Sequence, residues 1–256
     1  MYADTHFHLC PGLDDGPRDL DVALQLCHLA WNEGTRAIAA LAHQSDMFAD
    51  VTPPQIRSAV ADVETALRDM DIPLKLVPTA EVMVTPDVVE RWQAGELLTY
   101  GDANKYILLE YPHGLYVDLR DVAADFIEAG VRPVIAHAER QPELLYQFEE
   151  ICELIQIGCV IQVSTRSLTD STSAQQTRAL KQWAERGVIH CLGSDAHSPH
   201  RRPPTMAAAV DTLSRWTSAS EALLIARDNG MAILDGQPLR LGAPKPPRRR
   251  SWFNFR

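Results

Sequence analysis

The chain has 256 residues, a formal net charge of −10 and 46% hydrophobic residues, which suits one large α/β domain with a full core. No apolar run approaches the ~20 residues needed to span a bilayer, and the N-terminus lacks a secretory signal, so we expect a soluble, unexported protein. Its five cysteines show no C-x-x-C spacing, which argues against a disulfide framework or a zinc knuckle and favours a reducing cytoplasm.

Short apolar runs alternate with helical patterns along the chain, which indicates repeated β-α units around a parallel sheet. Seven strands are predicted, at residues 3–8, 37–43, 74–82, 106–111, 132–138, 159–164 and 188–195. Helical patterns cover residues 21–34, 53–70, 86–95, 118–130, 142–158, 172–187, 205–216 and 219–230. Several begin near Pro, Asp, Ser or Thr and end at Gly. We therefore predict a closed or nearly closed barrel, and periodicity leaves an open doubly wound sheet as the alternative.

Six of the seven predicted strands end in a histidine or a carboxylate. In chain order these residues are His6, His8, His43, Glu81, Glu110, His137, Asp195 and His197. His6 and His8 stand two residues apart and so point to the same face of their strand. Side chains at the C-terminal ends of barrel strands meet at one rim, where crowded carboxylates need positive charge beside them. A cluster of two or three metal ions would supply that charge, and imidazole and carboxylate ligands without thiolate suit Mn²⁺, Fe or Zn²⁺.

The first strand leads into a loop with further candidate ligands, in the stretch DTHFHLCPGLDDGP at residues 4–17. Spacing alone does not decide between Asp14 and Asp15 as a metal ligand. Three divalent ions with four carboxylate ligands keep a surplus of about two positive charges, which attracts an anionic substrate. Arg140 in HAER and Arg202 in SPHRRPP follow ligand-bearing strands, and a guanidinium fork matches phosphate oxygens in pairs. These residues together indicate a phosphate ester as substrate.

A markedly basic stretch lies at the C-terminal end. Residues 245–256 carry five basic residues and no acidic one, so the rest of the chain has a net charge of −15. Such an acidic body argues against a nucleic-acid platform. We expect a disordered, solvated tail, with contact to an anionic membrane surface or a partner as the alternative. The predicted organisation is one domain over residues 1–240 and a basic tail over residues 241–256.

The order of these motifs resembles the PHP superfamily, named for polymerase and histidinol phosphatase, and within it the capsule and exopolysaccharide type of metal-dependent protein tyrosine phosphatase. The most specific element is D-x-H-x-H-x-x-P-G-x-D-D-G-P, and TAEV, LLEYP, VIAHAER and GSDAHSPHRRPP follow in the expected order. The match covers residues 1–240. The chain departs from the family with HAER in place of HPER and with Ala42 in place of a proline, and neither change removes an expected ligand. The resemblance implies a distorted (β/α)7 barrel of the PHP, TIM-barrel-like kind.

The resemblance also implies three divalent ions, usually manganese. Their expected ligands are His6, His8, Glu81 and Asp195 for the first ion, Glu81, Glu110 and His137 for the second, and Asp15, His43 and His197 for the third. The expected catalytic residues are Asp195 and the two phosphate-binding arginines, Arg140 and Arg202. It is thus the resemblance that selects Asp15 over Asp14.

The function implied by the resemblance is hydrolysis of phosphotyrosine on the cytoplasmic tail of a bacterial tyrosine autokinase that controls polysaccharide synthesis. Such a reaction needs no cysteine nucleophile, and no cysteine of the chain is followed six residues later by the arginine of a C-x5-R loop. Two alternatives remain at this point. One is a phosphatase of small molecules such as histidinol phosphate, and the other is a nonhydrolytic regulatory protein that binds a kinase.

Overall fold

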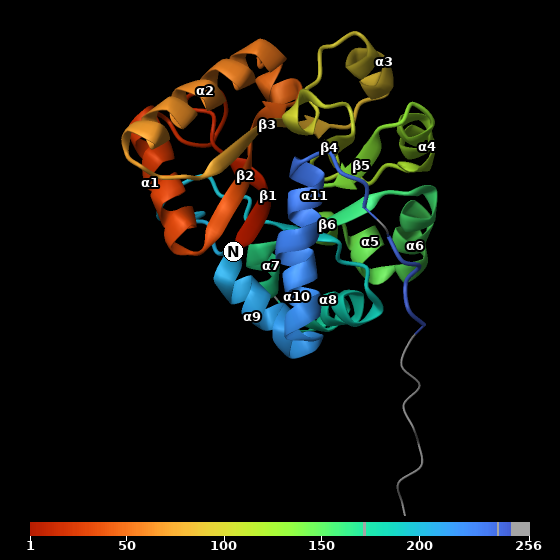
Figure 1. The fold of residues 1–256 in the computed structure, drawn as a ribbon. Coiled ribbons are helices and arrows are strands. Elements are labelled where there is room, and N and C mark those ends of the chain that lie inside the picture. The colour runs from red at the N-terminus through yellow and green to blue at the C-terminus, as the bar shows by residue number, and fades with distance from the viewer. Residues whose placement is uncertain (171–172, 240, 247–256) are drawn as a thin grey trace, which may run out of the picture.

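The seven predicted strands form one parallel sheet that curls into a nearly closed barrel (Figure 1). The computed structural model describes residues 1–170, 173–239 and 241–246. The strands are β1 (Tyr2–His8), β2 (Thr35–Gln44), β3 (Lys75–Met83), β4 (Tyr106–Glu110), β5 (Arg132–Ile135), β6 (Val160–Ser164) and β7 (Cys191–Gly193). They lie side by side in chain order, and a single bridge from Phe7 to Ala196 joins the last strand back to the first. The predicted distorted (β/α)7 barrel is therefore confirmed.

Helices connect the strands and cover the outside of the barrel (Figure 1). The α-helices are α1 (Leu20–Asn32), α2 (Pro53–Asp69), α3 (Val88–Gln93), α4 (Arg120–Glu128), α5 (Pro142–Tyr146), α6 (Phe148–Ile157), α7 (Thr165–Thr169), α8 (Ala174–Arg186), α9 (Met206–Trp216), α10 (Ala219–Leu223) and α11 (Gly230–Leu234). Short 3-10 turns are η1 (Asp46–Phe48), η2 (Tyr100–Asp102) and η3 (Ala138–Arg140), and η4 (Leu224–Asn229) is a π-helical segment.

Local sequence signals explain where the longer helices begin. The Asp19 side chain accepts a hydrogen bond from the amide of Val22 and so caps α1, while Thr52 and Gln55 form a capping box ahead of α2. The single helix predicted over residues 142–158 is wrong, because the backbone of Gln147 is not helical (φ −106°, ψ 87°) and separates α5 from α6. Apolar spacing continues across that break, so periodicity could not show it.

The barrel interior is filled by small and medium apolar side chains. One buried cluster takes at least one residue from each of the seven strands, which places it inside the barrel. Its strand members are Ala3, Ala37, Ala39, Leu41, Val77, Tyr106, Leu108, Val134, Val160 and Cys191. The larger cluster takes the alternate positions, such as Ile38, Ala40 and Ala42, and packs them beneath the helices. Because side chains alternate along a strand, His43 follows Ala39 and Leu41 toward the interior.

Strand β1 breaks this alternation with a register shift between Asp4 and Phe7. Ala3 belongs to the cluster inside the barrel. Phe7 lies four positions later and would face the same side in a regular strand, but it belongs to the cluster beneath the helices. The irregularity therefore exchanges the two faces of the strand, as β-bulges do. As a result, His6 and His8 point toward the interior at the C-terminal end of β1.

The N-terminal end of the barrel is closed by apolar side chains. Tyr100 from η2, Ile233 and Leu234 from α11, and Leu239 join the inner cluster, and the Tyr100 hydroxyl donates to the Thr5 carbonyl (2.9 Å). The chain then passes α8, where Lys245 and Arg186 exchange two hydrogen bonds (2.7 and 2.8 Å). Most of the predicted basic tail, residues 247–256, lies outside the described residues.

Candidate metal centre

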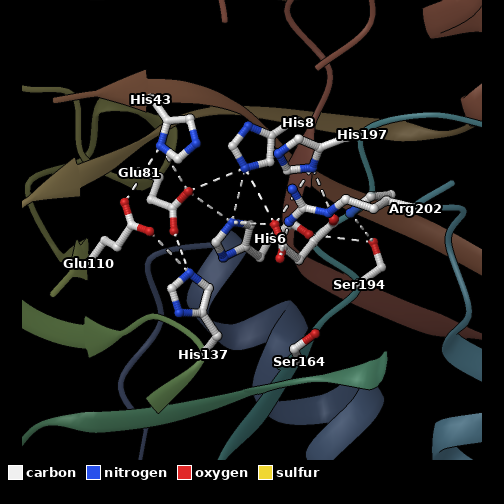
Figure 2. A network of polar contacts seen from close by, with 12 residues as sticks. His6, His8, His43, Glu81, Glu110, His137, Ser164, Ser194, His197 and Arg202 are labelled. Carbon is white, nitrogen blue, oxygen red and sulfur yellow. Dashed lines mark hydrogen bonds and ion pairs between the residues drawn. The ribbon is translucent and has the colours of Figure 1, made fainter. Parts of the chain in front are cut away.

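The expected ligands gather at the C-terminal rim of the barrel, around Glu81 (Figure 2). The Glu81 carboxylate is only 1% exposed. Its Oε2 lies 3.2 Å from Nε2 of His6, 3.2 Å from Nε2 of His8 and 3.2 Å from Nδ1 of His43, and its Oε1 lies 2.9 Å from Nε2 of His137. One carboxylate from β3 therefore faces four imidazoles, which is the position of a bridging ligand.

Glu110 and Asp15 face the outer histidines of the group. The Glu110 carboxylate lies 3.5 Å from Nε2 of His137 and 3.6 Å from Nδ1 of His43. Asp15 reaches in from the loop after β1, and its Oδ1 lies 3.3 Å from Nε2 of His197 and 3.5 Å from Nε2 of His43. The rim thus brings together all nine residues expected to ligate metal.

Three sets of these residues could each hold an ion, because their donor atoms lie within 4.8 Å of one another. The sets are His6, His8 and Glu81; His43, Glu81 and Glu110; and His8, Asp15, His43 and His197. They differ from the expected grouping in that His43 joins the two glutamates and His8 joins the set with Asp15. Asp195 Oδ1 approaches the first set, at 3.4 Å from His6 Nε2.

The donor atoms suit divalent cations on their own chemistry. Nδ1 of His43, Nε2 of His197 and Oε2 of Glu110 are buried and make no hydrogen bond within the described part of the chain. Buried imidazole nitrogens and carboxylate oxygens without partners are costly unless a cation coordinates them. The site fits metal ions with mixed nitrogen and oxygen coordination.

A hydrogen-bond chain fixes the tautomer of His6. The Thr5 hydroxyl donates to the Leu192 carbonyl (2.8 Å), so it can only accept from Nε2 of Gln162 (2.8 Å). That contact turns Oε1 of Gln162 toward Nδ1 of His6 (2.9 Å), which must carry the hydrogen. The free lone pair of His6 is therefore on Nε2, directed at Glu81 and ready for a metal.

Sequence reasoning did not identify Gln162 as part of the site, because β6 is the one predicted strand that ends without a histidine or carboxylate. The available signal was its position. Gln162 lies two positions after Val160, a residue of the inner cluster, and so faces the interior as well. A buried amide on that face needs polar partners, and it finds them in His6 and Thr5.

Asp14 holds His8 in the same way. Its Oδ2 accepts from Nδ1 of His8 (2.7 Å) and from the amide of His43 (3.0 Å), and its Oδ1 accepts from the amide of Gly16 (2.9 Å). Asp14 thus orients a ligand and shapes the loop, as a carboxylate behind a metal-binding histidine does. Asp15 alone of the two aspartates faces the cluster.

Protons and metal ions compete for these imidazoles. Burial lowers the pKa of His8, but Asp14 and Glu81 outweigh it and raise the pKa to about 10. Burial and Arg140 lower the pKa of His137, whereas Glu110 and Glu81 raise it to about 9. A cation that takes the lone pairs must displace these protons, so metal binding releases protons and its affinity increases as the pH rises.

Gly193 at the end of β7 makes room for His6. A Cβ at this position would lie 2.3 Å from the Cβ of His6 and 3.1 Å from the Gln162 side chain. Any larger residue would have to move the strand that carries the first ligand. The glycine in the GSDAH motif is therefore a requirement of the close approach between β7 and β1.

Asp195 connects the metal cluster to the two arginines. It follows β7 with a left-handed backbone (φ 56°), and its Oδ2 accepts hydrogen bonds from Nη2 of both Arg140 and Arg202. Burial raises the pKa of Asp195, but nearby His6 and Arg140 hold it well below its usual value. A cavity of about 150 Å³ lies in front of these groups, and its lining includes Arg140, Arg202 and Phe48. Its walls match an anion of phosphate size.

The cysteines are not nucleophiles of this site. All five are free, and four of them are buried. Burial raises the pKa of Cys27, Cys159 and Cys191 to about 12, and that of Cys10 above this range. A thiol with such a pKa holds its proton at neutral pH and is a poor nucleophile.

Comparisons with known proteins agree with this geometry. The family model described as capsular polysaccharide synthesis, CpsB/CapC, matches residues 2–235. The chain is 28% identical over 260 residues to tyrosine-protein phosphatase YwqE of Bacillus subtilis (strain 168), covering 98% of this chain and 99% of the relative. It is 26% identical over 241 residues to tyrosine-protein phosphatase CpsB of Streptococcus pneumoniae, covering 91% and 98%. A crystal structure from work on YwqE and CpsB as metal-dependent tyrosine phosphatases aligns with a TM-score of 0.87 at 27% identity, covering 96% of this chain and 99% of that one.

Proposed function

The chain belongs to the capsular polysaccharide synthesis family CpsB/CapC, and from this premise we propose that it is a metal-dependent tyrosine-protein phosphatase. Its relatives in Bacillus subtilis and Streptococcus pneumoniae carry that activity in their names. The observation that carries the proposal is the position of Asp195 between two groups. Its Oδ1 faces the histidine cluster at His6, and its Oδ2 accepts hydrogen bonds from both Arg140 and Arg202. This places a phosphate-binding pair directly beside a metal centre.

The residues of the site divide the work of phosphate ester hydrolysis. Bound divalent ions would lower the pKa of a water molecule and neutralise charge on the phosphoryl oxygens. Arg140 and Arg202 would hold the remaining phosphoryl oxygens, and their guanidinium groups keep a positive charge throughout. Asp195 holds both arginines at the edge of the cavity before substrate arrives, so little reorganisation is needed.

We propose manganese as the metal and three ions as the number. Nine residues offer donor atoms, which is more than one ion uses, and three groups of donor atoms at the rim support three ions. The proposed ligands are His6, His8, Glu81 and Asp195; Glu81, Glu110 and His137; and Asp15, His43 and His197. Imidazole and carboxylate donors without thiolate support manganese, with iron or zinc as the other metals of this chemistry.

The proposed substrate is phosphotyrosine on a bacterial tyrosine autokinase that regulates capsular or exopolysaccharide synthesis. The family description supports the capsule pathway. Of the helices in the described residues, none has the length and apolar character of a membrane span. We place the phosphatase domain at residues 1–240 in the cytoplasm, a reducing compartment in which free cysteines are common. For the basic residues of 241–256 we propose a solvated tail, with contact to an anionic membrane surface as the alternative.

The test is hydrolysis of para-nitrophenyl phosphate and of a phosphotyrosine peptide with Mn²⁺, before and after chelation. We expect turnover of both substrates, loss of turnover after chelation and recovery when Mn²⁺ is restored. Turnover that survives chelation would contradict the metal mechanism. Turnover of histidinol phosphate but not of the peptide would indicate a small-molecule phosphatase, and turnover of none of the three would indicate a binding protein.

Arg140→Lys tests the role of the guanidinium fork. Lysine keeps the charge but loses the paired donors, so kcat/KM for both substrates should fall about a hundredfold while the metal content stays unchanged. Cys191→Ala is the matched control at a buried position close to the site in sequence, and it should retain its turnover. Equal turnover by Arg140→Lys and wild type would remove the arginine from the proposed machinery.

A further inference from the structure

A second cavity of about 430 Å³ adjoins the metal site. It shares Arg140, Asp195 and Arg202 with the cavity in front of the metal cluster. Beyond these residues its lining includes Arg166 from α7 and Arg201 from the loop after β7. We call this second cavity the arginine annex. Because the two cavities have three residues in common, a ligand held at the metal site lies beside the annex.

The annex concentrates positive charge in a protein whose body is acidic. Four arginines line it, against two carboxylates, Asp195 and Asp170. Asp195 is shared by Arg140 and Arg202, and Asp170 lies 3.6 Å from Arg166 with both side chains exposed. Arg201 makes no ion pair within the described residues. The annex therefore keeps a surplus of positive charge that the metal site itself does not require.

The buried hydroxyl of Ser164 gives the annex a polar wall. Ser164 is 1% exposed and lines the cavity, and its Oγ has no hydrogen-bond partner in the described residues. Its amide is already held by the Glu139 carboxylate (3.2 Å), so the hydroxyl is not needed to fix the loop. A buried donor without a partner is costly and is satisfied by an acceptor atom entering the annex. Figure 2 shows Ser164 at the edge of the network, below the arginine side of the site.

We propose that the arginine annex binds the carboxylate of an acidic residue that flanks the phosphotyrosine in the substrate, and that Arg201 and Arg166 select for it. The inference rests on the proposed phosphatase activity. Guanidinium groups pair with carboxylates in a bidentate manner, and Ser164 can donate to an oxygen of the same group. A free phosphate would occupy only Arg140 and Arg202, so the additional arginines act on the part of the substrate beyond the phosphotyrosine.

Matched peptides test the selection. One phosphotyrosine peptide carries glutamates on both sides of the phosphotyrosine, and its partner carries glutamines at the same positions. We expect the wild-type enzyme with Mn²⁺ to have a kcat/KM about five- to tenfold higher for the glutamate peptide at low salt, and the preference should shrink as salt is added. Equal kcat/KM for the two peptides would overturn the proposal.

Substitutions in the annex assign the preference to its arginines. Arg201→Gln and Arg166→Gln should each reduce the preference to about twofold and leave hydrolysis of para-nitrophenyl phosphate, which has no flanking residue, unchanged. Arg227→Gln is the control, because among the described residues Arg227 pairs only with its neighbour Asp228 on η4. Arg201→Glu should reverse the order and favour a peptide with lysines beside the phosphotyrosine.

The outcomes separate the two claims. If the variants keep the wild-type preference, the annex does not select the substrate, even though the enzyme is a phosphatase. If neither peptide nor para-nitrophenyl phosphate is turned over by wild-type enzyme with Mn²⁺, the proposed function fails first. In that case, tighter binding of the glutamate peptide than the glutamine peptide, lost in Arg201→Gln, would still support an acidic-peptide site.

Discussion

Two parts of the barrel position the proposed metal ligands by different means. In the arc formed by β2, β3 and β4, β2 and β3 pair in unbroken register from Ala37 and Lys75 to Gln44 and Val82. In the seam formed by β6, β7 and β1, the strands pair over three positions and then through a single bridge. The side chains of the arc that face the site continue the alternation of their strands. Ligands of the seam need additional side chains to hold them.

The seam replaces missing backbone hydrogen bonds with side-chain ones. The Asp4 carboxylate accepts from the amides of His6 (3.2 Å) and Ser194 (2.8 Å), and the Thr5 hydroxyl donates to the Leu192 carbonyl (2.8 Å). Burial raises the pKa of Asp4 to about 6 although these donors lower it. The contrast teaches that the position of a ligand in the seam depends on residues that never touch a metal. Substitution of a side chain that supports the site in the seam should therefore lower metal affinity, and substitution of a supporting side chain in the arc should mainly lower stability.

Gly193→Ala should have the largest effect, because its new Cβ would lie 2.3 Å from the Cβ of His6. We expect a loss of about 3 kcal/mol or more in the free energy of unfolding, since β7 and β1 must separate. Denaturant unfolding and metal content after purification measure the effect. Gly242→Ala is the control, because nothing lies within 4 Å of its new Cβ. A variant as stable and metal-loaded as wild type would show that the seam tolerates separation.

Asp14→Asn should lower Mn²⁺ affinity about thirtyfold. Asp14 accepts from three donors, on His8, His43 and Gly16, and the amide group of asparagine must turn a donor toward one of them. Calorimetric titration with Mn²⁺ measures the affinity. Asp62→Asn, at an exposed position on α2, should bind like wild type. Unchanged affinity in Asp14→Asn would mean that His8 is positioned by its strand alone.

Gln162→Leu should lower Mn²⁺ affinity about tenfold, since Nδ1 of His6 loses its acceptor and the ring loses its fixed tautomer. The same titration measures it. Val163→Ala, at the neighbouring position that faces the outer cluster, should lose stability but keep its affinity. If the two variants bind Mn²⁺ alike, the hydrogen bond from His6 to Gln162 does not contribute to metal binding.

Gln44→Leu tests the arc and should have the smallest effect on metal affinity, within about twofold. Gln44 donates to the carbonyls of Val51 and Glu96 and accepts from the amide of Leu98. Its loss leaves buried backbone groups without partners and should cost about 2 kcal/mol in the free energy of unfolding. A tenfold loss of affinity would show that the adjacent His43 also depends on side-chain support, and the distinction between arc and seam would not hold.

The same distinction explains how much of the site the sequence could predict. In the arc, His43, Glu81 and Glu110 continue the inward alternation of apolar residues, so a strand prediction already indicates their direction. In the seam, the register shift of β1 reverses the faces, and the spacing of His6 and His8 showed only that they share one. Strand ends were least accurate there, since the segment predicted over residues 188–195 forms a strand only at Cys191–Gly193.

Other features depend on three-dimensional contacts that a sequence pattern does not contain. The expectation of Asp15 rather than Asp14 came from the family resemblance. In the structure the Asp14 carboxylate accepts from His8, whereas Asp15 faces His43 and His197. The predicted strand over residues 132–138 stops at Ile135, and His137 is presented by a left-handed turn (φ 29°). The meeting of Arg140 and Arg202 on one oxygen of Asp195 joins residues far apart in the chain.

The junction of β1 with β7 also determines when the site can form during synthesis. His6 precedes Asp195 and His197 by nearly 200 positions, and the inner cluster extends to Leu239. During synthesis, the strands of the arc are therefore complete before Asp195 and His197 have been added. Contacts of such long sequence separation slow folding. We expect the arc to gain structure first and metal to be captured in the last step, when the two ends of the domain meet.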